Sequence, residues 1–308
     1  MKKHDICSIV VTYNRKELLL SNLKMTLSQD LQTDIIVVDN HGNDGTKEYL
    51  QKELMNFDDI QYFYLESNIG GAGGFNFGVV KAYEMGYNWI ILMDDDGKPG
   101  DIHCFGNLFA DIKKNKYKSS DLIMLNSLVT YNGIDLSFGF GHLVSIKELH
   151  NKKIIENDNT INGMINPFNG TIISRGLIEK IGYPNKDFFI KGDEIDYTLR
   201  AQNAGAIIKT IVSSDYRHPK VANMKTKRIL GHPMHVFIEA PWKEYYSIRN
   251  NVYSIMKNGG TRKKTIFFLA KRIFCAIISK CNKIKTIKMQ IRGYRDGMRG
   301  NLGATVKP

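Results

Sequence analysis

The amino-acid sequence predicts an α/β fold, with a mostly parallel sheet flanked by helices and a basic helical extension after it. Three observations lead to this prediction. Short apolar runs alternate with segments of helical periodicity over the first half of the chain. Several of these runs end in acidic and turn-forming residues, as buried strands do, and the last third of the chain is strongly basic. Alternating strands and helices need right-handed crossovers and therefore favour parallel strands.

The elements are expected in a regular order along the chain. Strands are predicted over 6–13, 34–40, 60–65, 89–93, 122–129 and 207–212, with a turn into a further strand over 166–174. Helices are predicted over 15–28, 175–181, 242–253 and 265–279. Three more are expected to begin at residue 46, at the glycines after 69 (ending near 85) and after 192. The segment 131–150 is rich in glycine and polar residues, and we expect a loop over the active site there.

Charge divides the chain into two parts. Residues 1–215 contain 22 Lys+Arg and 28 Asp+Glu, whereas residues 216–308 contain 21 Lys+Arg and 3 Asp+Glu. The basic part is expected to meet an anionic surface, and nucleic acid and an anionic membrane leaflet are both candidates. We place the predicted domain boundary at residue 240, which gives a catalytic domain over 1–240 and a basic helical region over 241–308.

Cysteine usage and hydropathy suggest a cytoplasmic protein. Cys7, Cys104, Cys275 and Cys281 are scattered and form no CxxC pair, so neither a zinc site nor a disulfide framework is expected. The N-terminus lacks the apolar region of a signal peptide, and no uninterrupted run of about 18 apolar residues is present. We therefore expect no transmembrane helix.

The central motif is a strand that runs into three carboxylates. Trp89 to Met93 is apolar, and Asp94, Asp95 and Asp96 follow directly. In an open parallel sheet this edge is where ligands bind. Adjacent carboxylates repel each other, so the motif predicts Mg²⁺ or Mn²⁺, shared with substrate phosphates. An acidic turn without a ligand is the alternative.

A glycine-rich segment, Gly70-Gly71-Ala72-Gly73-Gly74, follows Asn68 and the third predicted strand. Glycines let the backbone approach a ligand, and amides at a helix N-terminus favour phosphate. The segment does not match GxGxxG and carries no Walker lysine. A tight turn with close helix packing is therefore an equal alternative.

A second acidic cluster, Asp193-Glu194-Ile195-Asp196, opens a predicted helix. A carboxylate there is a candidate general base, and a helix cap is the alternative that does not exclude it. His218 stands before Pro219, where a histidine is more often structural than a ligand.

The basic region contains two helical segments of interest. In the first, over 242–253, Arg249 is placed to face a phosphate. In the second, over 265–279, lysines interrupt an apolar pattern that is too short to span a bilayer, and we expect it to lie in the interface of an anionic membrane. A helix docked on the catalytic domain or on a partner is the alternative. The glycine-rich segment 293–303 suits a mobile flap or an assembly contact, so oligomerisation stays open.

The order of these motifs resembles the family-two glycosyltransferases, which have the GT-A fold, over roughly residues 6–256. The resemblance rests on Val10-Val11-Thr12-Tyr13-Asn14-Arg15, Val37-Val38-Asp39-Asn40, Asn68 with its glycines, the Asp triplet and Asp193-Glu194, in this order. Within the family the Asn68 segment and Met93-Asp94-Asp95-Asp96 are most similar to bacterial galactofuranosyltransferases. Rhamnosyltransferases come second, because their loop usually has fewer glycines.

The resemblance implies a role for each matching position. Glu194 would be the catalytic base, and Asp193 would position the acceptor. Asp94, Asp96 and His218 would bind the metal. The nucleotide sugar would contact Thr12, Tyr13, Arg15, Asp39, Asn68, Gly71, Asp94, Asp95 and Arg249. Two positions depart from the family: the base is Glu where many members have Asp, and Gly192 stands where galactofuranosyltransferases can carry Trp.

The implied activity is a metal-dependent, inverting transfer of a sugar in cell-surface polysaccharide synthesis, such as O-antigen or capsule. The expected donor is UDP-galactofuranose, with dTDP-rhamnose as the alternative. The expected acceptor is a glycan, free or linked to a polyprenyl diphosphate, at the inner face of the plasma membrane. A nucleic-acid-binding protein that uses the basic tail is an alternative of another class, although no zinc or RNA-binding motif supports it. A nucleotidyltransferase would normally need a glycine-rich loop after the first strand, and Asn14-Arg15-Lys16 has no glycine.

Overall fold

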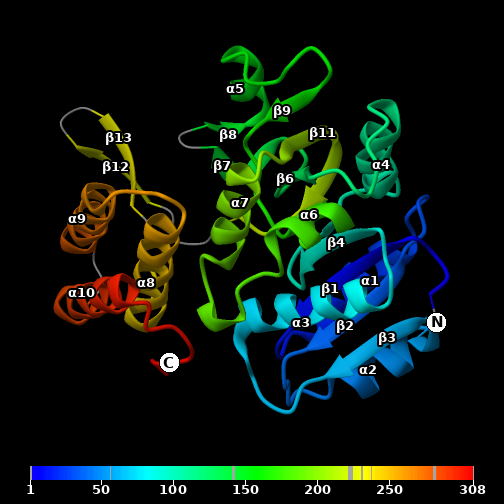
Figure 1. Ribbon diagram of the computed structural model, residues 1–308, viewed down its shortest axis with the longest axis horizontal. Coiled ribbons are helices and arrows are strands. Elements are labelled where there is room, and N and C mark those ends of the chain that lie inside the picture. Colours follow the sequence, from blue (N-terminus) through cyan, green and yellow to red (C-terminus); the bar gives the residue numbers. More distant parts are fainter. Residues whose placement is uncertain are drawn as a thin grey trace. The chain divides into compact units, whose positions relative to one another are not determined.

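The computed structural model of the protein describes residues 2–55, 57–140, 143–220, 225–229, 232–236, 238–279 and 282–307 (Figure 1). These residues fall into two compact units. The first is drawn from 1–68, 74–183 and 201–220, and the second from 69–73, 184–200 and 221–308. The second unit thus includes the segment around Asp193 as well as the C-terminal helices. A functional boundary at residue 240 stays a prediction.

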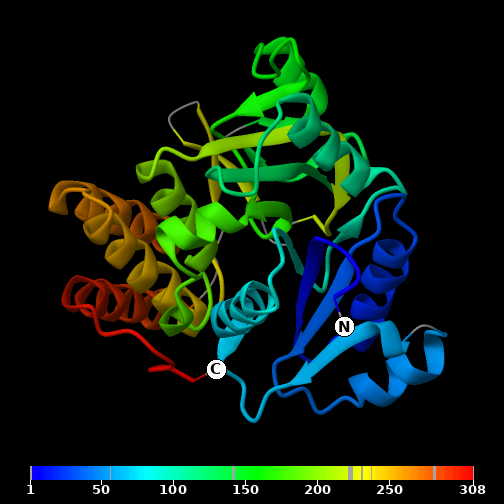
Figure 2. The ribbon, with the colours of Figure 1, turned by 45° about the vertical axis from the view of Figure 1, so that its right-hand side comes forward.

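The first unit is built on one large sheet. Its main strands, in order across the sheet, are β3 (Ile60–Tyr64), β2 (Asp34–Asp39), β1 (Ile6–Thr12), β4 (Trp89–Asp94), β10 (Asn169–Ser174), β6 (Ile123–Thr130), β11 (Ile207–Arg217) and β5 (Lys98–Pro99). The first four strands along the chain are parallel, as the sequence predicts: β1 (Ile6–Thr12), β2 (Asp34–Asp39), β3 (Ile60–Tyr64) and β4 (Trp89–Asp94). Figure 2 shows three of them side by side in blue. Every residue of β1 and β2 is buried, which is the pattern of a parallel sheet with both faces covered.

The other half of the sheet is mixed. β10 (Asn169–Ser174) runs antiparallel to both β4 and β6 (Ile123–Thr130), and β6 is parallel to β11 (Ile207–Arg217). The short β5 (Lys98–Pro99) and β9 (Thr160–Asn162) pair antiparallel with β11. The unit also contains α1 (Lys16–Leu27), α2 (Thr46–Glu53), a 3₁₀ turn (Phe57–Asp59), α4 (Cys104–Lys114) and α6 (Arg175–Ile181).

The segment 131–150 corrects one expectation. It is not a loop, because it forms β7 (Asp135–Phe140), β8 (Leu143–Ser145) and α5 (Ile146–Asn151). β7 extends the sheet from β6, with Thr130 opposite Leu136. Leu136, Leu143 and Leu149 form the buried centre of a separate apolar cluster. The strand β7 has a signal in the sequence, because Leu136, Phe138 and Phe140 alternate with polar residues or glycine. The run is short, however, and the glycines and polar residues around it favour a loop.

Strand β11 is longer than predicted. The apolar pattern ends near 212, but pairing with β6 resumes at Asp215 and continues to Arg217 after an irregularity in register. Such a bulge inserts unpaired residues and re-aims the strand that follows. As a result the strand ends directly before His218.

The second unit contains three helices that lie next to one another: α8 (Pro241–Lys257), α9 (Arg262–Ile278) and α10 (Lys283–Arg299) (Figure 1). It also contains β12 (Lys225–Ile229) paired with β13 (His232–Val236), and a 3₁₀ turn (Lys186–Phe188). Helices α3 (Gly70–Glu84) and α7 (Asp193–Asn203) begin in this unit and continue into the first.

Helix α10 packs closely on the backbone of α8. A Cβ atom at Gly293 would lie 2.5 Å from the carbonyl oxygen of Tyr245, and one at Gly297 would lie 2.4 Å from that of Arg249. These glycines therefore permit helix contact. Of the two alternatives for 293–303, a mobile flap does not fit the packing of Gly293 and Gly297, and an assembly contact stays a prediction.

Two further expectations concern cysteines and membrane helices. Cys7, Cys104 and Cys275 are buried and form no disulfide, whereas Cys281 lies outside the described residues. Within the described part of the chain, no helix combines the length and the apolar character that crossing a bilayer requires.

Candidate functional site

The ends of three parallel strands bring the predicted site residues to one edge of the sheet. In the strand register Thr12 lies opposite Asp39, and Val11 lies opposite Asp94. Because β1, β2 and β4 are parallel, their carboxyl ends meet at this edge, where open α/β sheets bind ligands. The structure thus groups Thr12, Asp39 and the Asp triplet as the sequence predicts.

The triplet is already balanced by a positive side chain. Arg15 Nη1 lies 3.0 Å from Asp95 Oδ1 and 2.9 Å from Asp96 Oδ2. The hydroxyl of Thr12 donates to Asp95 Oδ2 at 2.8 Å. Burial lowers the pKa of Arg15, but the charges of Asp95 and Asp96 outweigh this effect and raise it. The sequence argument assigned this balancing charge to a metal alone, whereas in the structure Arg15 supplies part of it.

Asp95 and Asp96 differ in their environment. Burial raises the pKa of Asp95, and its contacts with Arg15 and Thr12 offset this only in part. Burial acts to raise the pKa of Asp96 as well. The hydrogen bond to His218 and the charges of His218 and Arg15 outweigh burial and bring this pKa below the usual value. Asp96 is therefore the carboxylate of this pair that is held firmly ionised.

His218 faces Asp96 directly. Its Nε2 lies 3.2 Å from Asp96 Oδ1, and its Nδ1 lies 2.7 Å from the carbonyl oxygen of Pro219. Burial lowers the pKa of His218, while the hydrogen bond and charge of Asp96 more than compensate and raise it. A histidine whose Nδ1–H donates to a carbonyl oxygen directs the lone pair of Nε2 outward when it is neutral, which is how metal-binding histidines are commonly oriented.

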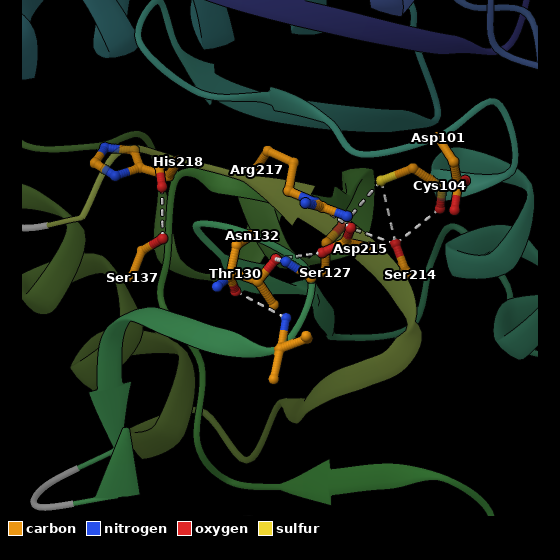
Figure 3. A network of polar contacts seen from close by, with 12 residues as sticks. Asp101, Cys104, Ser127, Thr130, Asn132, Ser137, Ser214, Asp215, Arg217 and His218 are labelled. Atoms are coloured by element: carbon orange, nitrogen blue, oxygen red, sulfur yellow. Dashed lines mark hydrogen bonds and ion pairs between the residues drawn. The ribbon is translucent and has the colours of Figure 1, made fainter. Parts of the chain in front are cut away.

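The backbone of His218 is held by the β6–β7 region. The Ser137 hydroxyl donates to the carbonyl oxygen of His218 at 2.6 Å (Figure 3). The His218 amide donates to the carbonyl oxygen of Thr130 at 2.9 Å, and the rings of Phe138 and His218 have their centroids 4.6 Å apart. The sequence did not predict Ser137 and Phe138 as supporting residues, because they lie in the segment expected to be a loop.

The donor atoms suit a divalent cation in part. Carboxylate and imidazole are both ordinary ligands of Mn²⁺, and Mg²⁺ or Mn²⁺ commonly uses one or two protein groups together with substrate phosphates. Asp96 and His218 provide such a pair. Among the described residues no group of three His, Cys, Asp or Glu side chains converges as a metal site, so Asp94 does not complete a preformed trio. Asp94 does act on His218, since its charge contributes to the raised pKa.

A cavity of about 280 Å³ opens beside this pair. It is lined by Leu18, Ser21, Asp95, Asp96, Gly97, Lys98, Tyr131, Arg217, His218 and Pro219. Lys98 Nζ donates to the Ser21 hydroxyl at 2.8 Å, and Arg217 is paired with Asp215 (Figure 3). The sequence argument did not predict these two cavity residues. Lys98 closely follows the Asp triplet and Arg217 directly precedes His218, and this proximity in the sequence could have indicated them.

The predicted nucleotide-binding residues are arranged unevenly. Asp39 is buried and accepts hydrogen bonds from the Gly42 amide at 2.7 Å and from the Tyr62 hydroxyl. Tyr13 is 46% exposed. The side-chain amide of Asn40 donates a hydrogen bond to Asn68 Oδ1 at 3.1 Å. Their role in nucleotide binding stays a prediction.

The glycine-rich segment serves mainly for packing. A Cβ atom at Gly70 would lie 2.0 Å from the carbonyl oxygen of Phe189, and one at Gly74 would lie 2.5 Å from Val11. At Gly71, by contrast, a Cβ atom would meet nothing within 4 Å. Gly70 and Gly74 therefore permit the close contacts of the packing alternative, and a ligand contact at Gly71 stays a prediction.

The second acidic cluster lies in the second unit. Asp193 and Glu194 occupy the first turn of α7, and Asp193 is 5% exposed. Glu194 is partly exposed, and its Oε2 accepts a hydrogen bond from the Gly192 amide at 2.9 Å. Asp196 is instead paired with Arg200 at 2.8 Å. Of the two proposed catalytic acids, Glu194 is thus the more accessible.

The departure at Gly192 has a backbone explanation. Its φ of 87° lies in the left-handed region that favours glycine. A tryptophan at this position would be strained in this conformation of the loop.

Arg249 is not placed as the sequence suggested. It is fully buried, and its guanidinium donates to the carbonyl oxygens of Phe188 at 2.9 Å and Gly303 at 2.6 Å. Nε donates to Asn250 Oδ1 at 2.8 Å. Its N–H groups therefore donate to the protein itself. The sequence had instead predicted that Arg249 faces a phosphate.

Comparison with protein families shows which family these features belong to. Residues 7–182 match the family model described as "Glycosyl transferase family 2". The chain belongs to this family. It is therefore a glycosyltransferase, and the GT-A fold expected from the sequence is confirmed.

The glycosyltransferase is similar to curated proteins of two kinds. It is 29% identical over 262 residues to "Galactofuranosyltransferase GlfT1" of Mycolicibacterium smegmatis, covering 84% of this chain and 85% of that protein. Its identity to the protein of the same name from Mycobacterium tuberculosis is 30% over 264 residues, covering 84% of each chain. It is 24% identical over 317 residues to "dTDP-rhamnosyl transferase RfbF" of Shigella flexneri, covering 97% of each.

Solved structures of low sequence identity share the fold of this glycosyltransferase. GalNAc-T7 with UDP, GalNAc and Mn²⁺ has a TM-score of 0.61 at 13% identity, and the match covers 96% of this chain and 56% of that one. The mannosyltransferase PcManGT from Pyrobaculum calidifontis, with GDP-Man and Mn²⁺, has a TM-score of 0.57 at 12% identity, covering 99% and 76%. TarS 1–349 of S. aureus with UDP-GlcNAc has a TM-score of 0.56 at 18% identity, covering 97% and 81%.

Proposed function

We propose that this glycosyltransferase moves galactofuranose from UDP-galactofuranose to a glycan, free or linked to a polyprenyl diphosphate, with inversion of configuration. The identity to GlfT1 proteins, 29–30% over 84% of the chain, supports this donor above dTDP-rhamnose, for which the identity is 24%. Membership of a glycosyltransferase family argues against the nucleotidyltransferase alternative.

The proposed reaction assigns a role to each acidic cluster. Glu194 accepts the proton of the acceptor hydroxyl while that oxygen attacks the anomeric carbon, and the bond to the diphosphate oxygen breaks on the opposite face. Asp193 orients the acceptor. Asp96 and His218 would hold a divalent cation, Mn²⁺ or Mg²⁺, which supplies positive charge for the departing diphosphate. Arg15 keeps the neighbouring Asp95 and Asp96 carboxylates in place until the donor arrives.

The geometry of Asp96 and His218 is the observation that supports the metal. A donor screen by thermal shift, with and without Mn²⁺, tests the proposal with UDP-galactofuranose, UDP-galactopyranose, UDP-glucose and dTDP-rhamnose. A Mn²⁺-dependent rise in Tm with UDP-galactofuranose that is lost in Asp96→Ala is the expected result. A rise in Tm with dTDP-rhamnose alone would show that dTDP-rhamnose, and not UDP-galactofuranose, is the donor. No rise in Tm with any nucleotide sugar would contradict the proposal.

We also propose that α9 rests on an anionic membrane at the cytoplasmic side, where a polyprenyl-linked acceptor would be found. One face of this helix carries exposed apolar side chains: Ile266 at 51%, Phe267 at 74%, Phe274 at 41% and Ile277 at 49%. Cys275 and Ala276, on the other face of the helix, are buried. Exposed Lys263, Lys264 and Lys271 accompany the apolar face, and such a combination favours anionic lipid.

Vesicle flotation with the full chain tests the membrane proposal. The double variant Phe267→Ser, Phe274→Ser should lose flotation with vesicles of phosphatidylcholine and phosphatidylglycerol. Ile134→Ser, which alters a 65% exposed residue of the first unit, is the matched control and should float as the wild type does. Equal flotation of all three proteins would contradict this proposal.

A further inference from the structure

The loop 187–192, which leads into Asp193 and Glu194, has an unusual backbone. Phe189 and Lys191 have φ of 65°, and Gly192 has φ of 87°. For side chains other than glycine this left-handed region is sparsely populated and strained. The loop therefore depends on contacts from elsewhere to keep its conformation.

Asn250 of α8 provides the densest of these contacts. Its Nδ2 lies 3.0 Å from the carbonyl oxygen of Phe188, 2.9 Å from that of Ile190 and 2.6 Å from that of Lys191. The side chain is fully buried. One amide thus binds three carbonyl oxygens of the loop, on both sides of a residue with left-handed φ.

Arg249 sets the orientation of that amide. Its Nε donates to Asn250 Oδ1 at 2.8 Å, which leaves Nδ2 facing the loop. Its Nη2 donates to the carbonyl oxygen of Phe188 at 2.9 Å. The two neighbouring residues therefore act on the loop together.

The segment 303–306 contributes a third set of contacts. The Gly303 amide donates to the carbonyl oxygen of Asp187 at 2.6 Å, and the Gly303 carbonyl oxygen accepts from Arg249 Nη1 at 2.6 Å. The Tyr246 hydroxyl donates to the Val306 carbonyl oxygen at 2.7 Å and accepts from the Val306 amide at 3.0 Å. The segment is thus bound both to α8 and to the start of the loop.

The end of the loop contacts the proposed base itself. The Gly192 amide donates to Glu194 Oε2 at 2.9 Å, and the Gly192 carbonyl oxygen accepts from the Asp196 amide at 2.9 Å. A change in the conformation of the loop would move this amide and release the carboxylate. The chain of contacts from Asn250 to Glu194 is continuous.

We propose that Arg249, Asn250 and the segment 303–306 are positioning residues that hold the Glu194 carboxylate in its reactive orientation through the loop 187–192. This inference rests on the proposed function, because it takes Glu194 as the base. None of these residues needs to contact either substrate. Their contribution is to the geometry of the base, and a misplacement of about 1 Å can cost about 10²-fold in rate.

Asn250→Asp is the variant that tests the proposal. It keeps the size of the side chain and the acceptor for Arg249, but it removes the N–H donors to the three carbonyl oxygens. We expect kcat for UDP release from UDP-galactofuranose, with water as acceptor, to fall about 10- to 100-fold, with KM for the donor unchanged. Asn251→Asp is the control, because Asn251 donates to the Ser247 carbonyl oxygen of its own helix at 2.8 Å. It should retain the wild-type kcat.

A double-mutant cycle separates positioning from general support of the fold. Asn250→Asp should have no further effect on kcat in the Glu194→Gln background, because the group that it positions is already inactive. An equal loss in both backgrounds, or a kcat for Asn250→Asp as high as for Asn251→Asp, would overturn the inference. If Asn250→Asp does not fold, Tyr246→Phe decides: a lowered kcat with unchanged UDP affinity supports the inference, and an unchanged kcat overturns it. Full turnover by Glu194→Gln would instead contradict the proposed function.

Discussion

Asp96 and His218 face each other at 3.2 Å, with the far nitrogen of the histidine bound to the Pro219 carbonyl oxygen at 2.7 Å. Both ring nitrogens therefore have acceptors when His218 is protonated. A divalent cation and the Nε2 proton would compete for the same lone pair.

Replacing Asp96 should change the titration of His218. In Asp96→Asn the charge that raises the His218 pKa is removed while the burial that lowers it remains, so this pKa should fall. NMR of the imidazole Cε1–H signal over pH 5–9 measures it, with His218→Gln used to assign the signal. An unchanged or higher pKa in Asp96→Asn would contradict the pairing.

Replacing His218 should weaken the binding of the metal ion. Mn²⁺-dependent affinity for UDP in His218→Gln is expected to fall about tenfold or more, since even residues that only orient a metal ligand contribute about 10- to 100-fold. Calorimetric titration of UDP with and without Mn²⁺ measures this difference. The control is His103→Gln, an exposed histidine paired with Asp30, which should leave UDP affinity as it is. Equal Mn²⁺ dependence in both variants would exclude His218 as a ligand.

Replacing Arg15 should increase the response to metal. In Arg15→Gln the Asp95 and Asp96 carboxylates lose their positive partner, so Mn²⁺ should raise Tm more in this variant than in the wild type. Differential scanning fluorimetry with a Mn²⁺ series measures it. Lys24→Gln, an exposed change on α1, is the control. A Tm response in Arg15→Gln no larger than in Lys24→Gln would show that the triplet does not bind the ion.

Removing the proposed base should affect turnover and leave donor binding intact. For Glu194→Gln we expect kcat to fall about 10²–10⁴-fold, because the acceptor proton then has no carboxylate to receive it. UDP affinity in the presence of Mn²⁺ should stay at the wild-type value. Steady-state UDP release together with calorimetry measures both quantities, and loss of UDP binding would show that the change reaches beyond the base.

Filling the contact between α8 and α10 should destabilise the protein. A Cβ atom in Gly297→Ala would meet the Arg249 carbonyl oxygen at 2.4 Å, and overpacking of this kind costs about 1–3 kcal/mol. Urea unfolding measures the loss. Gly71→Ala is a suitable control, since a Cβ atom there meets nothing within 4 Å. Equal midpoints for the two variants would contradict the close packing of the helices.

The sheet edge was predictable because its signal is local. Apolar runs that end in Asp39 and Asp94 mark buried strands and the end at which each strand leaves the core. The pairing of Asp96 with His218 was expected only from the family resemblance, because no local pattern connects the two residues. The geometry of the pair depends on the bulge in β11, which interrupts the periodic pattern, and on Ser137 in β7, a short strand among glycines and polar residues.

Arg249 shows a different limit. An arginine among aromatic residues on a helix suits a phosphate contact and a buried contact with carbonyl oxygens equally well. Only the distances to Phe188 and Gly303 distinguish the two. The glycine-rich segment was ambiguous for the same reason, because Gly70 and Gly71 have the same side chain and opposite surroundings.

The contact between Asp187 and Gly303 has a consequence for biosynthesis. These residues lie far apart in the chain, and Gly303 leaves the ribosome long after the sheet has been made. If segment 303–306 is needed to set the loop beside Glu194, a nascent chain can fold its large sheet before it becomes able to transfer sugar. Maturation of the enzyme would then be timed by synthesis of segment 303–306.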